Sequence, residues 1–142
     1  MKINEDCIRN ILLYLSVNLT LDLKDNKNNY NKISVLELMN DLSDEYEKED
    51  IVYSVNILYQ AGYINGINLD QKNISLSRLK INDITNRGHI FCQNVGNPTV
   101  WDKTKKIISQ VGNHTLSFIE GVAHDIAVET SKEMVKSMMS SK

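Results

Sequence analysis

The chain has 142 residues, 42% of them hydrophobic and 24% charged, and a formal net charge of -2. This composition is typical of a soluble globular protein, and the small net charge excludes a general electrostatic attraction to nucleic acid or to a membrane surface. No stretch approaches the ~20 consecutive apolar residues of a membrane helix, and acidic residues stand where a secretory signal needs an apolar core, so we expect a cytoplasmic protein.

The first predicted helix follows Asn4, which can cap it, and runs to about residue 18. Isoleucines and leucines recur along it at the three- and four-residue spacing of one buried helix face. The next stretch, residues 22–32, is polar and rich in asparagine. This composition is typical of an exposed loop, and we expect one there.

Two further helices are predicted before the middle of the chain. The second begins after Ser34, and Glu37 three residues later completes a capping box; this helix ends near Ser43. The third covers 48–61, with an acidic first turn and a stripe of aliphatic residues on one face. Gly62 follows at the position where helices commonly take a left-handed residue.

A β-hairpin is predicted directly after the third helix. Alternating apolar residues begin at Tyr63, a polar turn follows near 70–73, and a second strand returns through 74–81. The apolar alternation slips within this second strand. The slip suggests a β-bulge or a strand end near Arg78.

Three more helices complete the predicted pattern. One begins at Thr85 and ends near residue 94, and the next begins at Asn97–Pro98, a strong start signal, and stops at Gly112. The last is long and covers about 115–139. It carries apolar residues on more than one side.

The order of helices and hairpin predicts an α+β fold that is mostly helical: a winged helix-turn-helix with a two-stranded wing, followed by C-terminal helices. The stretch I-T-x-x-G-x-x-F at 84–91 supports this prediction, because many winged-helix domains return from the wing into a helix through a similar threonine and glycine. We therefore expect a winged-helix domain at 1–95 and, at 96–142, a C-terminal helical extension that packs on it.

Three segments carry a resemblance to a known family. They are DCIRNILLYL (6–15), EDIVYSVNILYQAGYINGI (49–67) and INDITNRGHIF (81–91), the last followed by Trp101. They resemble a family of uncharacterised bacterial and phage proteins with a domain of unknown function, similar to the YjcQ-type winged-helix proteins. The resemblance covers residues 1 to about 120. It implies a winged-helix fold and an association with phages and mobile elements, and it implies no catalytic residue and no cofactor.

Helix 48–61 would be the recognition helix of a winged-helix domain. Asn56 and Gln60 on its outward face could each make paired hydrogen bonds to adenine, but phosphate contacts supply much of DNA affinity and would need cations from elsewhere. The residues that could contact DNA lie on this helix, on the wing and just after the wing: Lys48, Tyr53, Asn56, Gln60, Lys72, Arg78, Lys80 and Arg87.

The same residues have other interpretations. The outward face of the helix can simply be solvated, or Tyr53 and Ile57 can contact a protein partner. Basic side chains on the wing can protect an edge strand from pairing instead of contacting DNA. The lysines at 103, 105 and 106 fit a solvated helix face better than a nucleic-acid patch.

The last helix contains a short coiled-coil pattern with alternating three- and four-residue spacing. Because the helix is apolar on more than one side, we expect it to lie between two surfaces, one of them in its own domain. The second surface could belong to another subunit, which predicts a homodimer; the alternative is packing within one chain. The candidate dimer or partner residues share the coiled-coil pattern: Leu116, Ile119, Ala123 and Ile126.

No motif predicts catalysis. The chain lacks a glycine-rich phosphate loop and a nucleophile elbow, and its acidic run at 44–50 lacks the ligand spacing of a calcium loop. His89 and Cys92 stand three residues apart, but two ligands do not make a zinc site. Without a Cys-x-x-Cys pair or a secretory signal, Cys7 and Cys92 are expected to be free, reduced and buried. We predict no enzyme activity, no metal and no cofactor.

Two hypotheses of different classes follow. The first is a non-enzymatic DNA-binding winged-helix regulator of phage or mobile-element type. The alternative is a winged-helix protein–protein interaction module that uses helix 48–61 or the C-terminal helix.

Overall fold

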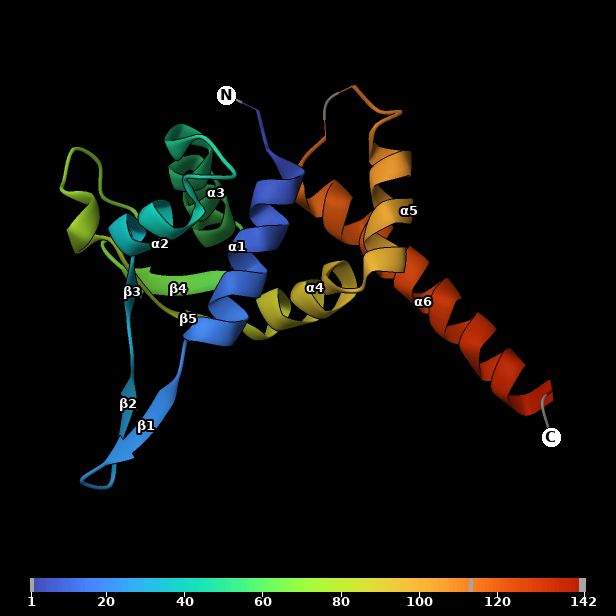
Figure 1. The fold of residues 1–142 in the computed structure, drawn as a ribbon, viewed down its shortest axis with the longest axis horizontal. Helices are drawn as coiled ribbons and strands as arrows, with labels where there is room; N and C mark the ends of the chain where they lie inside the picture. Colours follow the sequence, from blue (N-terminus) through green and yellow to red (C-terminus); the bar gives the residue numbers. More distant parts are fainter. Residues whose placement is uncertain (1, 113, 141–142) are drawn as a thin grey trace. The chain divides into compact units, whose positions relative to one another are not determined.

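A computed structural model describes residues 2–112 and 114–140 of the chain (Figure 1). The chain divides into two compact units, Met1–His89 and Ile90–Lys142. The described strands all lie in the first unit, and the described part of the second is helical. The predicted α+β class with a mostly helical content is therefore confirmed.

The helices of the first unit are α1 (Glu5–Asn18), α2 (Val35–Leu42) and α3 (Lys48–Gln60). Both predicted N-caps are confirmed, because the side chains of Asn4 and Ser34 accept hydrogen bonds from backbone amides in the first turns of α1 and α2. Helix α3 packs against both α1 and α2. The three helices contribute these buried aliphatic side chains to the core: Ile8, Ile11, Leu12, Leu15, Val35, Leu38, Ile51, Val55 and Leu58.

The end of α3 is fixed by a left-handed glycine. Gly62 has a φ of 83°, which confirms the prediction for this position. The Gly62 amide donates to the Tyr59 carbonyl at 3.1 Å, and the Tyr63 amide donates to the Leu58 carbonyl at 2.9 Å. This pair of bonds is the Schellman motif, which satisfies carbonyls at a helix end and turns the chain into the next element.

The first unit also contains a three-stranded antiparallel sheet. Its strands are β3 (Ile33–Ser34), β4 (Ile64–Ile67) and β5 (Lys80–Ile84), in the order β3-β5-β4. The β-bulge lies between Asn65 and Gly66, where the register against β5 shifts. The short strand that precedes α2 thus pairs with the last strand of the unit, across a long stretch of sequence.

The connection between β4 and β5 differs from the prediction. The strand expected at 74–81 is wrong in its first part, because loop 68–79 occupies that stretch and β5 starts only after it. The loop contains the 3-10 helix η1 (Leu76–Arg78) and buries the side chains of Leu69 and Leu79. The slip in apolar alternation therefore marks a strand boundary, since these leucines anchor a compact loop to the core rather than alternate along a strand.

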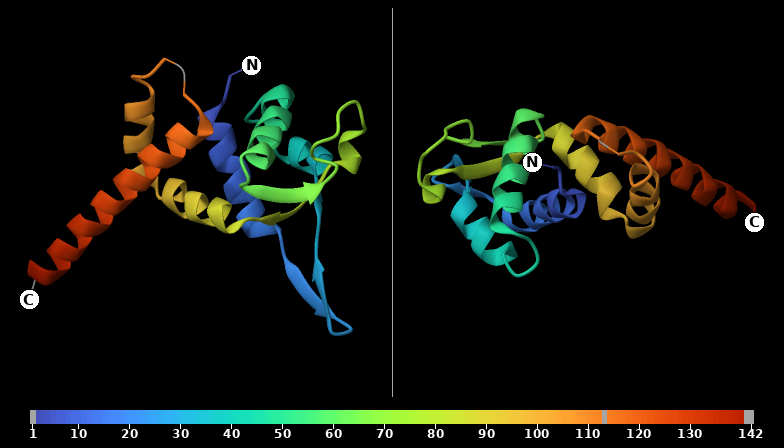
Figure 2. Two further views of the ribbon diagram at one scale, coloured as in Figure 1. Left: turned by 180° about the vertical axis from the view of Figure 1, so that it is seen from behind. Right: turned by 90° about the horizontal axis from the view of Figure 1, so that it is seen from above.

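The asparagine-rich stretch 22–32 also differs from the prediction. It is exposed as expected, but it forms a β-hairpin of β1 (Leu21–Lys24) and β2 (Lys27–Tyr30) rather than a loop. Asp25 and Asn26 between the strands have φ values of 55° and 58°. Two left-handed residues in a two-residue turn match the twist of a hairpin, and Asp and Asn tolerate that conformation. The hairpin extends away from α2 and α3 (Figures 1 and 2).

The remaining helices are α4 (Asn86–Gly96), which begins in the first unit, and α5 (Pro98–Ile108) and α6 (Leu116–Ser140) in the second. The Asn97 side chain caps α5 by accepting from two amides of its first turn, as predicted. Helix α5 ends earlier than the predicted stop at Gly112. Helices α5 and α6 pack against each other.

Thr85 links the start of α4 to the end of α3. Its hydroxyl donates to the Gly62 carbonyl at 2.7 Å and accepts from the Gly88 amide at 3.1 Å, so the predicted cap is confirmed. Its own amide donates to the Tyr63 carbonyl at 3.0 Å. One threonine therefore joins the two segments that enter and leave the sheet.

Candidate functional site

Helix α3 offers one polar face. Its aliphatic residues point into the core between α1, α2 and β4. The side chains of the opposite face and of the first turn are exposed or half-buried: Lys48, Glu49, Tyr53, Asn56 and Gln60. Only Lys48, in the first turn, is cationic among these. The face can make hydrogen bonds, but it provides little positive charge of its own.

Loop 68–79 and the strand after it provide the cations that α3 lacks. Lys72, Arg78 and Lys80 are all exposed. The loop carries a single acid, Asp70, so its local charge is positive. Lys80 lies opposite Ile67 in the β4–β5 ladder, where the two ends of the loop meet. The three cations therefore belong to one loop and to the first residue of the strand that follows it.

Arg87 has a different environment from the other basic candidates. Its Nη1 donates to the Ala61 carbonyl at 3.3 Å, and its guanidinium lies 4.8 Å from the centre of the Tyr63 ring. Both contacts join α4 to the end of α3. Arg87 is exposed, but we assign it to the structure of this junction rather than to the cations available for phosphate. A guanidinium that leaves these contacts for a phosphate loses a cation–π interaction.

The coiled-coil pattern in α6 faces the interior of the protein. All four candidate partner residues are buried within the chain, and α6 packs against α5: the residues are Leu116, Ile119, Ala123 and Ile126. They are therefore not available as an exposed dimer seam, which corrects that assignment. The exposed apolar side chains of α6 lie elsewhere, mostly in its second half: Phe118, Val128, Met134, Val135, Met138 and Met139.

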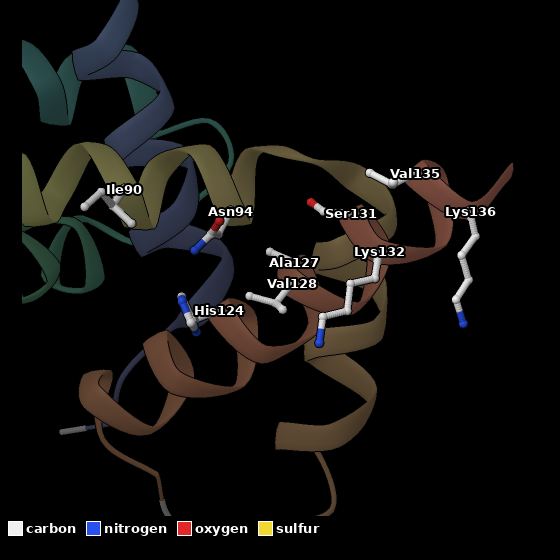
Figure 3. Close-up of a pocket in the computed structure, with 9 residues that line it drawn as sticks. All are labelled: Ile90, Asn94, His124, Ala127, Val128, Ser131, Lys132, Val135 and Lys136. Atoms are coloured by element: carbon white, nitrogen blue, oxygen red, sulfur yellow. The ribbon is translucent and has the colours of Figure 1, made fainter. Parts of the chain in front are cut away.

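A groove of about 700 Å³ lies in the second unit between the later turns of α4 and helix α6 (Figure 3). Its walls combine aliphatic side chains with a polar and basic rim. The lining residues from α4 are Ile90 and Asn94, and those from α6 are His124, Ala127, Val128, Ser131, Lys132, Val135 and Lys136. Ligand pockets of this volume are usually closed on most sides, whereas Ile90, Val128 and Val135 are exposed here. The groove is an apolar surface strip more than a ligand cavity.

Within 2–112 and 114–140, no group of three or more His, Cys, Asp or Glu side chains could hold a metal ion. In the same residues, no helix is both long enough and apolar enough to cross a membrane. Three surfaces of the described residues are candidates for binding: the α3 face with the neighbouring basic loop, the apolar strip on α6, and the exposed hairpin.

The Cys7 thiol is fully buried and forms no disulfide bond, and Cys92 is a second buried cysteine outside any disulfide. Burial raises the pKa of Cys7 to about 11; the Ser54 hydroxyl lowers it in part, and the Asp50 carboxylate raises it further. We expect Cys7 to react with iodoacetamide at about pH 8 at least about 100 times more slowly than an ordinary thiol, because the thiolate is the reactive form.

Mass spectrometry of labelled peptides measures this rate for Cys7. In a concentrated urea solution the rate should rise to that of an unfolded cysteine, which serves as the control. Rapid labelling of Cys7 in the folded protein would contradict the buried environment described above.

Comparison with protein families gives one match. The model of a family described as hypothetical protein (DUF2513) matches residues 2–114, which include residues 2–89 of the first unit and all of α5. No curated protein and no solved structure matches the chain significantly.

Proposed function

The chain belongs to the DUF2513 family, and we propose that its first unit is a winged helix that binds duplex DNA. The observation that supports this most is the topology: α2 and α3 lie in the chain between β3 and the β4–β5 pair of a sheet with the order β3-β5-β4, and a polar, basic loop joins β4 to β5. Helix α3 would be the recognition helix and loop 68–79 the wing. The likeness to YjcQ-type winged-helix proteins and a role as a non-enzymatic regulator of phage or mobile-element type belong to the same proposal.

The proposed contacts divide into two kinds. Asn56 and Gln60, with Tyr53 beside them, would reach base edges, where amide side chains recognise adenine. Lys48 and the loop cations Lys72, Arg78 and Lys80 would contact phosphates and supply most of the affinity. Because α3 itself brings one cation, binding depends on the loop more than in a domain with a basic recognition helix.

The first test is the binding of a labelled random duplex by fluorescence anisotropy at low salt. We expect the wild-type protein to bind with a micromolar Kd that weakens steeply as salt rises. The triple variant Lys72→Glu, Arg78→Glu, Lys80→Glu should bind at least about tenfold more weakly, and the slope of log K against log salt should fall by about three, one unit for each lost phosphate contact.

A matched control changes the same amount of charge elsewhere. Lys103, Lys105 and Lys106 lie on α5, outside the proposed interface, and all three are exposed. Their replacement by glutamate alters the net charge as much as the loop variant does, but it should leave the affinity within about twofold. Equal losses in both triple variants, or no binding by the wild-type protein at micromolar concentration, would refute DNA binding through this face.

A protein-interaction module is the second candidate function. The lack of positive charge on the outward face of α3 supports it. Four of five polar-face side chains carry no positive charge, and Glu49 in the first turn would repel phosphate. The half-buried Tyr53 and Ile57 could then contact a protein. In this case the anisotropy assay shows no binding, and Tyr53→Ala should abolish retention of a partner that wild-type protein retains in a pull-down.

A further inference from the structure

The β1–β2 hairpin exposes an apolar face. All residues of both strands are exposed, and Leu21, Leu23 and Tyr30 are 52%, 71% and 42% exposed. Leu21 lies opposite Tyr30, and Leu23 follows two residues after Leu21, so the three side chains share one face. A two-stranded hairpin alone is marginally stable in water and gains from additional strands. Among the described residues, no third strand pairs with the outer edge of β1 or of β2.

The hydrogen-bond pattern shows which backbone groups lie on the free edge of β1. The Asn31 amide donates to the Thr20 carbonyl at 3.0 Å, and the Thr20 amide donates to Oδ1 of Asn31 at 2.6 Å, so the backbone groups of Thr20 point toward Asn31 as in a hydrogen-bonded pair. Such pairs alternate along an antiparallel ladder, so the pairs of Asp22 and Lys24 are also hydrogen-bonded to β2. The backbone N–H and C=O of Leu21 and Leu23 consequently point away from β2. They form a short row of donors and acceptors that another strand can pair with.

We propose that this edge pairs with the same edge of a second copy of the chain. In an antiparallel pairing about a two-fold axis at Leu23, the outward N–H and C=O of Leu23 bond to those of Leu23 in the second copy. Asp22 of each copy then lies opposite Lys24 of the other. The axis therefore creates two identical Asp22–Lys24 pairs, and the two Leu23 residues lie opposite each other at the position between these pairs.

The charges select this register over its neighbours. An axis at Asp22 sets the two Asp22 side chains opposite each other, and an axis at Lys24 does the same with the two lysines; like charges directly opposite are destabilising. An axis at Leu21 requires Leu19 to join the ladder, but Leu19 is the C-cap residue of α1. If two copies pair through their β2 edges instead, no acidic residue lies opposite Lys27, because β2 contains none. Among these registers, only the axis at Leu23 sets opposite charges against each other and also pairs the outward backbone N–H and C=O groups of residues within β1.

The product is a four-stranded antiparallel sheet with the apolar faces of both hairpins on one side. The interaction does not depend on DNA binding. Because only a few residues of each copy take part, the interface belongs to the small, transient class, and we expect a Kd of roughly 100 µM. Sedimentation equilibrium of the full chain up to about 1 mM measures this monomer–dimer equilibrium directly.

Proline substitutions test which edge of the hairpin forms the dimer. Leu23→Pro removes the outward N–H of β1, which the hairpin itself does not use, and proline is tolerated on an edge strand when its N side faces solvent. The matched control is Asn28→Pro, because Asn28 lies opposite Leu23 and its N–H points outward from the other edge. We expect Leu23→Pro to raise the dimer Kd at least about tenfold and Asn28→Pro to leave it within about twofold.

Charge reversal gives an independent readout. Asp22→Lys creates two Lys–Lys pairs across the axis, and Lys24→Asp creates two Asp–Asp pairs, so each variant alone should dimerise at least about tenfold more weakly than the wild-type protein. An equimolar mixture of the two variants restores opposite charges at both positions. We expect a heterodimer in the mixture with the wild-type Kd, which a merely unfolded hairpin would not give.

These measurements can support or overturn the proposed dimer. NMR contacts between the backbones of residues 24 and 27 check that the hairpin persists in every variant. A wild-type protein that stays monomeric up to about 1 mM overturns the proposal, because a transient dimer of this class is populated there. A dimer that is equally stable in Leu23→Pro, or a variant mixture no more dimeric than its components, overturns it as well and assigns any self-association to another surface.

Discussion

Gly88→Ala should destabilise the first unit by about 3 kcal/mol, although alanine normally stabilises a helix relative to glycine. Gly88 lies in the first turns of α4, and a Cβ at this position would lie 2.1 Å from the Tyr63 carbonyl oxygen and 2.7 Å from Cγ2 of Ile84. The carbonyl is held in place by the Thr85 amide at 3.0 Å. An alanine therefore has to push the start of α4 away from the backbone at the start of β4.

Urea unfolding followed by far-UV circular dichroism measures this loss. The control is Gly121→Ala, because Gly121 lies within α6 and an added Cβ would meet nothing within 4 Å. That variant should gain about 0.5–1 kcal/mol, as expected for a glycine in a helix with open space beside it. If both substitutions stabilised the protein, the close approach of α4 to Tyr63 would be excluded.

The parts of the fold that depend on local chemistry could be predicted from the sequence. Asn4, Ser34, Asn97 and Thr85 each satisfy amides within three residues of themselves, so their capping function needs no knowledge of the rest of the chain. Gly62 is similar, because a helix end that requires positive φ selects glycine wherever the helix packs. For this reason the bounds of α1, α2 and α3 are predictable almost to the residue.

The two β segments that were predicted wrongly depend on weaker or non-local signals. Residues 21–30 have no apolar core to face, so the usual hydrophobic signal of a strand is limited to Leu21 and Leu23; the Asp25–Asn26 turn was the only other indication of a hairpin. In loop 68–79, Leu69 and Leu79 are buried by tertiary packing. Spacing alone cannot distinguish such anchors from the alternating residues of a strand.

The candidate site was predictable in part, for a related reason. Helical geometry places Asn56 and Gln60 on the face opposite the core without further information. It does not show that Arg87 stacks over Tyr63, because that contact joins segments more than twenty residues apart. The α6 pattern is equally ambiguous in sequence, since Leu116 and Ile126 give the same spacing whether they face α5 or a second subunit.

Thr85→Val should destabilise the first unit by about 2 kcal/mol, because valine keeps the shape of threonine and removes its hydroxyl. The hydroxyl serves two partners: it caps α4 at the Gly88 amide and donates to the Gly62 carbonyl at the end of α3. The loss of a cap alone costs about 1 kcal/mol, and leaving the Gly62 carbonyl without this donor adds a similar amount. Thr85→Ser retains both bonds and should cost less than half as much.

A second threonine shows how much of this loss comes from the helix cap and how much from the bond to the Gly62 carbonyl. Thr115 at the start of α6 also caps its helix, accepting from the Phe118 amide at 3.2 Å, but it lies outside the α3–α4 junction. Thr115→Val should therefore cost only the cap, about 1 kcal/mol. Trp101 is the single tryptophan and lies in the second unit, so its fluorescence follows Thr115→Val, whereas amide hydrogen exchange in α3 follows Thr85→Val. Equal losses at the two sites would mean that the Gly62 contact adds nothing, and that α4 is joined to the end of α3 through the Thr85 amide, Arg87 and the close approach at Gly88 instead.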